Sequence, residues 1–265
     1  MICSFRRSEL ELWLTSDIFN WVTSVKTSNI SHGREWSRVY EIWEHADVTL
    51  QKACNEFNLI DAITTLKRAV DHRLRLLNKL YKFKRIPIQG KPSDLIKILH
   101  YLNIVRPMMV EKLIQIRNAV EHEDAPPPDC ETCKVFSELV WYFLRSTDNL
   151  VREIVLDFSL YPTESALNRY LLECRIGIEH GWNPTIGGWL PSQLISDESR
   201  DNWLKIVGDK YDSLSDYLAI SQDSSGEDYF SLDNGHQSEV AYFTGEIRGP
   251  AASLKRLIQM YFSLV

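Results

Sequence analysis

The chain has 265 residues, of which 44% are hydrophobic and 25% are charged, a balance that predicts a globular protein and excludes a disordered one. Its longest clean apolar run, Leu139–Leu144, is far shorter than the roughly 18 residues of a membrane-spanning helix, so no membrane span is expected. Five cysteines, an odd number, and a polar segment soon after Met1 predict reduced thiols and a cytoplasmic location.

The net charge of −6 is unevenly distributed along the chain. Residues 1–156 contain 22 Lys and Arg against 20 Asp and Glu, whereas residues 157–265 contain 8 against 16. This difference predicts two domains with unlike surfaces, of which the first is better suited to a polyanion. In the densest basic segment, Lys79–Arg85, Tyr81 and Phe83 could stack a nucleic-acid base, although a solvated helix end is the alternative.

Helical periodicity dominates the first half of the chain. Apolar residues spaced by three and four predict a helix within residues 34–57 and a second from about Asp61 to Phe83, with Asp61 as its N-cap. A Gly and a Pro at residues 90 and 92 then break the pattern. Ser93 or Asp94 can cap a short helix that ends near residue 101.

Pro107 is well placed to begin the next helix, which the prolines at 126–128 prevent from continuing. Residues 136–154 predict one more long helix with a polar interruption at 146–148. The first half therefore predicts an all-α bundle. The residues expected to form the buried stripe of the helix that follows Pro107 are Met109, Leu113, Ile116 and Val120.

The second half of the chain carries strand patterns. Residues 172–178 alternate between apolar and charged side chains, and further strands are expected at 217–220, 229–232 and 239–247. An amphipathic helix is expected at residues 251–262. The fold class is therefore predicted as α+β overall, with an N-terminal helical bundle in residues 1–158. A smaller α+β domain with an antiparallel sheet, expected to recognise a substrate or partner, follows in residues 159–265.

One short motif, Arg117-Asn118-Ala119-Val120-Glu121-His122, is expected in the last turns of its helix. With 17 Arg and 7 His in the chain, about one Arg-His pair with four to six intervening residues is expected by chance. The chain has three, the others being Arg38 with His45 and Arg175 with His180. Only Arg117 is followed directly by Asn, which singles out this pair.

Arg117, Asn118 and His122 combine the groups needed to cleave a phosphodiester. Attack of a ribose 2′-OH on its own phosphate needs a base for the nucleophile and an acid for the leaving oxygen, and imidazoles supply both. A guanidinium stabilises the charge that builds on the phosphate. Helical geometry directs Asn118 and His122 the same way but places Arg117 roughly 140° from His122. We therefore expect either a frayed last turn or a twofold axis that brings two motifs together.

On these residues the chain resembles the HEPN superfamily, all-α domains found in many prokaryotic ribonucleases. Its signature is Arg, four to six residues, then His, commonly with a polar residue after the Arg. The resemblance implies a metal-independent, cofactor-free endoribonuclease with Arg117 and His122 catalytic and Asn118 supporting. It also implies a homodimer with the active site at its interface, and a role in toxin–antitoxin or phage-defence systems, in which an inhibitor or antitoxin protein can be a partner. The resemblance covers residues 10–157.

Two other interpretations of the motif remain open. In the first, Arg117 pairs with Glu121 on the helix surface and His122 caps the last carbonyl groups. In the second, His122 joins Cys130 and Cys133 as a zinc ligand, as in zinc deaminases. Asp129 separates Pro128 from Cys130 and Asp124 replaces the expected glutamate, so we expect no metal.

A rival function of a different class is a non-catalytic helical module that dimerises and docks a partner protein through the acidic second half. The tryptophans of the first half are expected in its core. Those of the second half, Trp182, Trp189 and Trp203, could stack RNA or line an interface. The sequence contains no Gly-rich phosphate loop and no Gly-x-Ser-x-Gly turn, so nucleotide-driven chemistry and serine hydrolysis are not expected.

Overall fold

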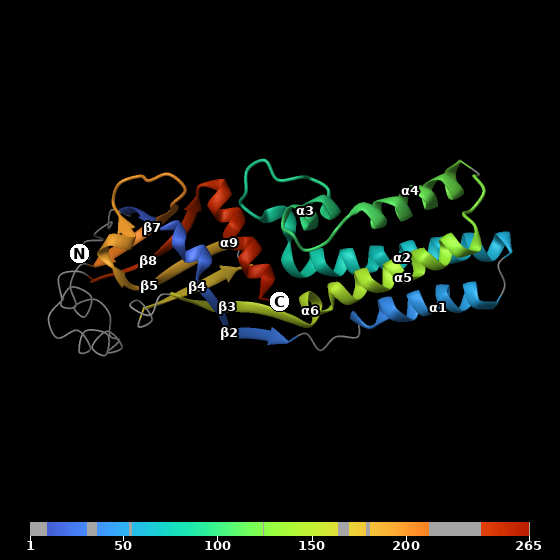
Figure 1. Cartoon of the computed structure of the whole chain (residues 1–265), viewed down its shortest axis with the longest axis horizontal. Coiled ribbons are helices and arrows are strands. Elements are labelled where there is room, and N and C mark those ends of the chain that lie inside the picture. The colour runs from blue at the N-terminus through green and yellow to red at the C-terminus, as the bar shows by residue number, and fades with distance from the viewer. Residues whose placement is uncertain are drawn as a thin grey trace, which may run out of the picture. The chain divides into compact units, whose positions relative to one another are not determined.

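The computed structural model describes residues 10–30, 36–52, 55–123, 125–163, 170–178, 181–211 and 240–264. These residues form two compact units (Figure 1). The helical unit comprises the described parts of Asn29–Ile86 and Gly90–Ile154, and the sheet unit those of Met1–Ser28, Pro87–Gln89 and Val155–Leu264. Within the described part of the chain, no helix is both long and apolar enough to cross a membrane.

The helical unit is organised around one long helix, α2, which contacts every other α-helix of the unit. All eleven residues that α2 buries, except Thr65 and Arg73, are apolar or aromatic, which explains why this helix lies at the centre. The helices of this unit are α1 (Arg38–Lys52), α2 (Glu56–Tyr81), α3 (Leu95–Tyr101), α4 (Met108–His122), α5 (Cys130–Ser146) and α6 (Asp148–Arg152), with a 3-10 turn at Phe83–Arg85.

Side-chain caps define where several of these helices begin. The Asp94 carboxylate accepts a hydrogen bond from the Lys97 N–H, which confirms Asp94 as the N-cap of α3. Helix α2 begins at Glu56, before Asp61, so Asp61 is not its N-cap. The N-cap is Asn55, whose Oδ1 atom accepts a hydrogen bond from the Asn58 N–H at 2.9 Å. Asp129 caps α5, and the hydrogen bond from the Thr132 N–H lowers the pKa of its carboxyl group.

The sheet unit contains an eight-stranded sheet in the order β2-β3-β4-β5-β8-β7-β1-β6. The pairs from β3 to β6 along this order are antiparallel, in agreement with the predicted antiparallel sheet. The strands are β1 (Leu10–Leu14), β2 (Val22–Ile30), β3 (Glu153–Tyr161), β4 (Leu171–Gly177), β5 (Asn183–Pro191), β6 (Ile195–Ser196), β7 (Leu204–Tyr211) and β8 (Val240–Gly249).

The C-terminal helix α9 (Ala251–Ser263) covers one face of this sheet. The Tyr261 hydroxyl donates a 2.9 Å hydrogen bond to the Val155 carbonyl of β3, and the Tyr261 ring lies 6.0 Å from that of Trp182. Side chains of β4 alternate accordingly, with Leu172 and Cys174 buried and Glu173 exposed between them. The opposite face of the sheet therefore carries the exposed charged side chains of β4.

The α+β class, the strand at 172–178 and the C-terminal helix are confirmed. The N-terminal all-α bundle differs, because β1 and β2 belong to the sheet and the helical unit begins at Asn29. β3 also begins at Glu153, inside the helix predicted for residues 136–154. Cross-strand partners far away in the sequence override the local pattern there. The strands expected at 217–220 and 229–232 lie outside the described residues.

A buried ion pair connects three helices of the helical unit. Arg73 of α2 is fully buried and donates to the Asp148 carboxylate at 2.7 Å and to the Thr147 carbonyl at 3.2 Å. The Tyr40 hydroxyl of α1 donates to the second Asp148 oxygen at 2.7 Å. Burial and the Asp148 hydrogen bond raise the pKa of Tyr40 to about 12. Asp148 thus balances the one buried guanidinium among the described residues.

Asp148→Ala is expected to lower the free energy of unfolding by about 3–5 kcal/mol, because it leaves the Arg73 guanidinium buried without a counter-charge. Urea unfolding monitored by circular dichroism measures this loss. Arg145→Ala is the control, since the half-exposed Arg145 side chain contacts the same carboxylate at 3.3 Å and should contribute about 1 kcal/mol or less. Equal losses for the two variants would contradict a dominant role for the buried pair.

Candidate functional site

Three side chains meet at the C-terminal end of α4. The Arg117 Nη1 atom donates to the Asn118 Oδ1 atom at 3.2 Å and lies 3.4 Å from the His122 Nε2 atom. Asn118 and His122 are exposed, and Arg117 is half-buried. The structure therefore brings together the three residues that the sequence singled out.

This convergence needs no fraying of the helix, contrary to the expectation from helical geometry. The Glu123 N–H still donates to the Ala119 carbonyl at 3.0 Å, so the hydrogen bonding of α4 continues to its end. The guanidinium lies at the end of a long, flexible side chain, so Arg117 can reach His122 although their Cα–Cβ bonds point about 140° apart. One chain can therefore present both groups to one phosphate.

Packing of the opposite side of α4 fixes the direction of the cluster. Leu113 and Val120 are buried as predicted, whereas Ile116 is only half-buried. Val110, which the sequence placed in the neighbouring strip, is buried instead. The Met109 side chain lies outside the described residues. α4 packs against α2 and α5 through this face, and the side chains of Asn118 and His122 remain open to solvent.

The contact between Arg117 and His122 joins a donor to an imidazole nitrogen. Because a guanidinium can only donate, the 3.4 Å contact is a hydrogen bond when the Nε2 atom of His122 carries a lone pair. An anionic group that bound Arg117 would compete for the same guanidinium hydrogen. It would thereby release the Nε2 lone pair beside itself, which places a base next to a bound phosphate.

The alternatives for this region differ in their outcome. The Glu121 side chain lies outside the described residues, so its pairing with Arg117 stays a prediction.

Cys130 is disulfide-bonded to a partner outside the described residues, which corrects the expectation of reduced thiols for this cysteine. The Cys133 thiol is buried, and this burial raises its pKa to about 11. Cys130, held in a disulfide, has no thiolate to offer a metal.

Several aromatic residues considered as base-stacking groups are inaccessible. Tyr81 and Phe83 are fully buried, and the Tyr81 hydroxyl donates to the Leu150 carbonyl at 2.8 Å. Trp182 is also fully buried, between Tyr261 and Phe262 of α9. These side chains serve the core, and the basic segment at 79–85 cannot stack a base through its aromatic residues.

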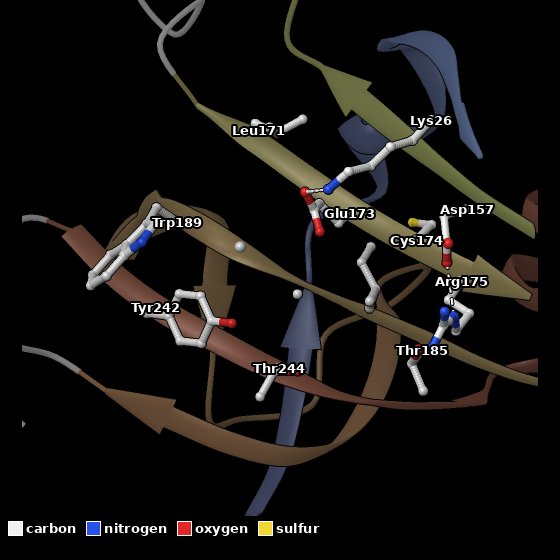
Figure 2. Close-up of a pocket in the computed structure, with 13 residues that line it drawn as sticks. Lys26, Asp157, Leu171, Glu173, Cys174, Arg175, Thr185, Trp189, Tyr242 and Thr244 are labelled. Carbon is white, nitrogen blue, oxygen red and sulfur yellow. Dashed lines mark hydrogen bonds and ion pairs between the residues drawn. The ribbon is translucent and has the colours of Figure 1, made fainter. Parts of the chain in front are cut away.

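A second concave region lies on the sheet face opposite α9 (Figure 2). We call it the groove, a cavity of about 680 Å³ lined by residues of β2, β3, β4, β5 and β8. Directly opposed residues form three rows across these strands. The residues of the rows are Leu171, Trp189 and Tyr242; Glu173, Gly187 and Thr244; and Asp157, Arg175 and Thr185.

The middle row creates the hollow because its central residue, Gly187, has no side chain between Glu173 and Thr244. Two ion pairs border the groove: Lys26 of β2 with Glu173, and Arg175 Nε with Asp157 Oδ1 at 2.9 Å (Figure 2). At the other end, the rings of Trp189 and Tyr242 lie 5.0 Å apart. The groove therefore combines an aromatic wall with paired charges.

The groove was not predicted from the sequence, in which Arg175 stood out only as a member of an Arg-His pair without a following Asn. Lys26 was assigned to a helical bundle, although alternation in Leu10–Leu14 and the β-branched residues of Val22–Ile30 were signals for strands. No sequence signal places Lys26 beside Glu173, because the two residues are 147 positions apart. No family model, curated protein or solved structure matches the chain.

Gly188→Ala is expected to destabilise the sheet unit more than Gly181→Ala, by about 2 kcal/mol or more. Both glycines have positive φ, +150° and +94° respectively, so both substitutions introduce backbone strain. Only at Gly188 would the added Cβ collide with backbone, at 2.3 Å from the Leu171 carbonyl oxygen. Denaturant unfolding of both variants measures the difference, and equal losses would show that β4 and β5 are not held this closely.

Proposed function

We propose that this protein is a metal-independent endoribonuclease that cleaves RNA by attack of a ribose 2′-OH on the adjacent phosphate. The observation that carries this proposal is the position of Arg117 Nη1, 3.2 Å from Asn118 Oδ1 and 3.4 Å from His122 Nε2 at an exposed helix end. A cation, an amide and an imidazole that share one small region match the requirements of this reaction. The open position suits a long polymeric substrate.

In the proposed reaction Arg117 binds the scissile phosphate and stabilises the negative charge of the phosphorane. His122 Nε2, released from Arg117, accepts the proton of the 2′-OH. The Asn118 Oδ1 atom accepts a hydrogen bond from the guanidinium, and the side-chain NH2 group of Asn118 can donate to a phosphate oxygen. The products are a 2′,3′-cyclic phosphate end and a 5′-OH end, whose oxygen must receive a proton as it leaves.

We further propose that the acid comes from the His122 of a second chain in a homodimer. One imidazole cannot occupy both sides of the phosphate at the same time, and a twofold axis through the cleft would supply the second. The resemblance to HEPN ribonucleases supports this arrangement. A cytoplasmic location, a toxin or phage-defence role and an inhibitor or antitoxin partner also stay proposals that rest on that resemblance.

A second candidate function is a helical interaction module without catalysis. The observation that favours it is the surface of α5, where Val135 and Tyr142 are 47% and 61% exposed. Tyr142 follows Val135 by seven positions, which places the two side chains on the same helix face about two turns apart. An apolar strip of this kind can be covered by a partner helix. In this case the Arg117–His122 contact would have only a structural role.

We expect the intact chain to cleave single-stranded RNA in the presence of EDTA and to leave 2′,3′-cyclic phosphate ends. Arg117→Ala and His122→Ala should each lower the cleavage rate at least about 100-fold, because each removes a group that acts in the transition state. Asn118→Ala should have a smaller effect. End-labelled RNA resolved on denaturing gels measures the rates, and mass spectrometry identifies the ends.

Arg106→Ala and His45→Ala are matched controls, since both residues are exposed in the same helical unit but lie outside the motif. All variants are compared at equal oligomeric state and with the circular dichroism of the intact chain. Cleavage that survives in both motif variants, or that EDTA abolishes, would contradict the proposal. Uncut RNA together with a stable protein complex formed through Val135 and Tyr142 would favour the interaction module.

A further inference from the structure

We propose that the groove on the sheet binds one base of single-stranded RNA and selects guanine, which gives the sheet unit a role in substrate recognition. This inference rests on the proposed ribonuclease function, because it assigns RNA as the ligand. The cavity of about 680 Å³ lies within the range of roughly 300–1,000 Å³ found for small-ligand sites. It is large enough for a nucleoside.

The aromatic row supplies a surface for a flat ring. Trp189 is only 4% exposed and packs against the Tyr242 ring at 5.0 Å, so the half-buried Tyr242 is the ring of this row that a base could reach. In Figure 2 both rings lie at the same end of the groove, away from the charged side chains. Single-stranded RNA exposes its bases, and stacking on an aromatic side chain is a common way to bind them.

The charged side chains favour a base edge over a phosphate. Lys26 and Arg175 carry two positive charges, but Glu173 and Asp157 cancel both, so the groove has little attraction for an anion. The two cations are hydrogen-bond donors and the two carboxylates are acceptors. Together they match a ligand that both accepts and donates hydrogen bonds. Guanine does so on one edge, where O6 accepts and N1–H and the N2 amino group donate. Only guanine offers a carboxylate two adjacent donor groups, because adenine and cytosine have one amino group and uracil has one N–H on that edge.

Glu173 is the acceptor best placed for this contact. It belongs to the middle row, directly opposite Gly187, so no side chain on β5 stands between its carboxylate and the floor of the groove. Its side chain is 52% exposed and can rotate away from Lys26 at low cost. Lys26 would then be available for the O6 atom of the same base.

The experiment measures binding of fluorescent RNA of about eight nucleotides to the Arg117→Ala/His122→Ala double variant, which should bind RNA without cutting it. The probes are an oligouridine, the same strand with one central guanosine, and one with inosine, which lacks the N2 amino group. Glu173→Gln in this background should weaken binding of the guanosine strand at least about fivefold. It should also abolish the preference for guanosine over inosine.

Charge decides between base recognition and phosphate binding. If the groove held phosphate, Glu173→Gln would remove a negative charge and strengthen binding of every strand, whereas base recognition predicts weaker binding of the guanosine strand alone. Glu11→Gln is the matched control, because Glu11 is also an exposed strand carboxylate paired with a lysine, Lys205, at 2.6 Å. Tyr242→Leu tests stacking separately and should weaken binding of all three strands.

Unchanged or stronger binding of the guanosine strand by Glu173→Gln, or an equal effect of Glu11→Gln, would overturn the proposal. Failure of the ribonuclease proposal is distinguishable, because it is judged on cleavage by the intact chain. An intact chain that cuts RNA, together with groove variants that bind normally, would refute only the base site. A chain that never cuts RNA but loses guanosine binding on Glu173→Gln would refute the ribonuclease and keep the base site.

Discussion

The helical unit depends on the burial of one charged residue, Arg73, in the middle of its central helix. A guanidinium with no exposed surface must have a counter-charge nearby, and Asp148 provides it at 2.7 Å. This requirement fixes where the chain between α5 and α6 lies against α2. The Tyr40 hydroxyl of α1 donates to the same Asp148 carboxylate, so α1 is held at this point too. Because α4 packs on α2 and α5, these two helices also hold the end of α4 that carries Arg117 and His122.

The two candidate sites differ in the kind of chemistry that they offer. At the end of α4 a guanidinium lies beside an imidazole, an arrangement that attracts an anion and supplies a base next to it. In the groove every cation is already paired with a carboxylate, so an aromatic wall and directional hydrogen bonds dominate. In our two proposals the first environment would take a phosphate and the second an uncharged base, and both groups are parts of RNA.

Local patterns were sufficient for the elements whose buried face is continuous in sequence. Most of the helical segments of the helical unit, the Asp94 cap, the strand β4 and the helix α9 follow from periodicity and capping chemistry. The strands β1 and β2 were missed because their partner strands come much later in the chain. β1, for example, pairs with β7, and its Leu12 lies opposite Ile206. Cross-strand neighbours, and not intrinsic preference, decide such segments.

The sequence by itself determined the composition of the α4 cluster, because Arg117, Asn118 and His122 follow one another on a single helix end. It did not determine that they touch, which depends on the direction of a flexible Arg side chain above a packed helix face. The groove was decided entirely by tertiary structure. Its lining residues come from strands as distant as β2 and β8, and only the register of an antiparallel sheet places Glu173, Gly187 and Thr244 in one row.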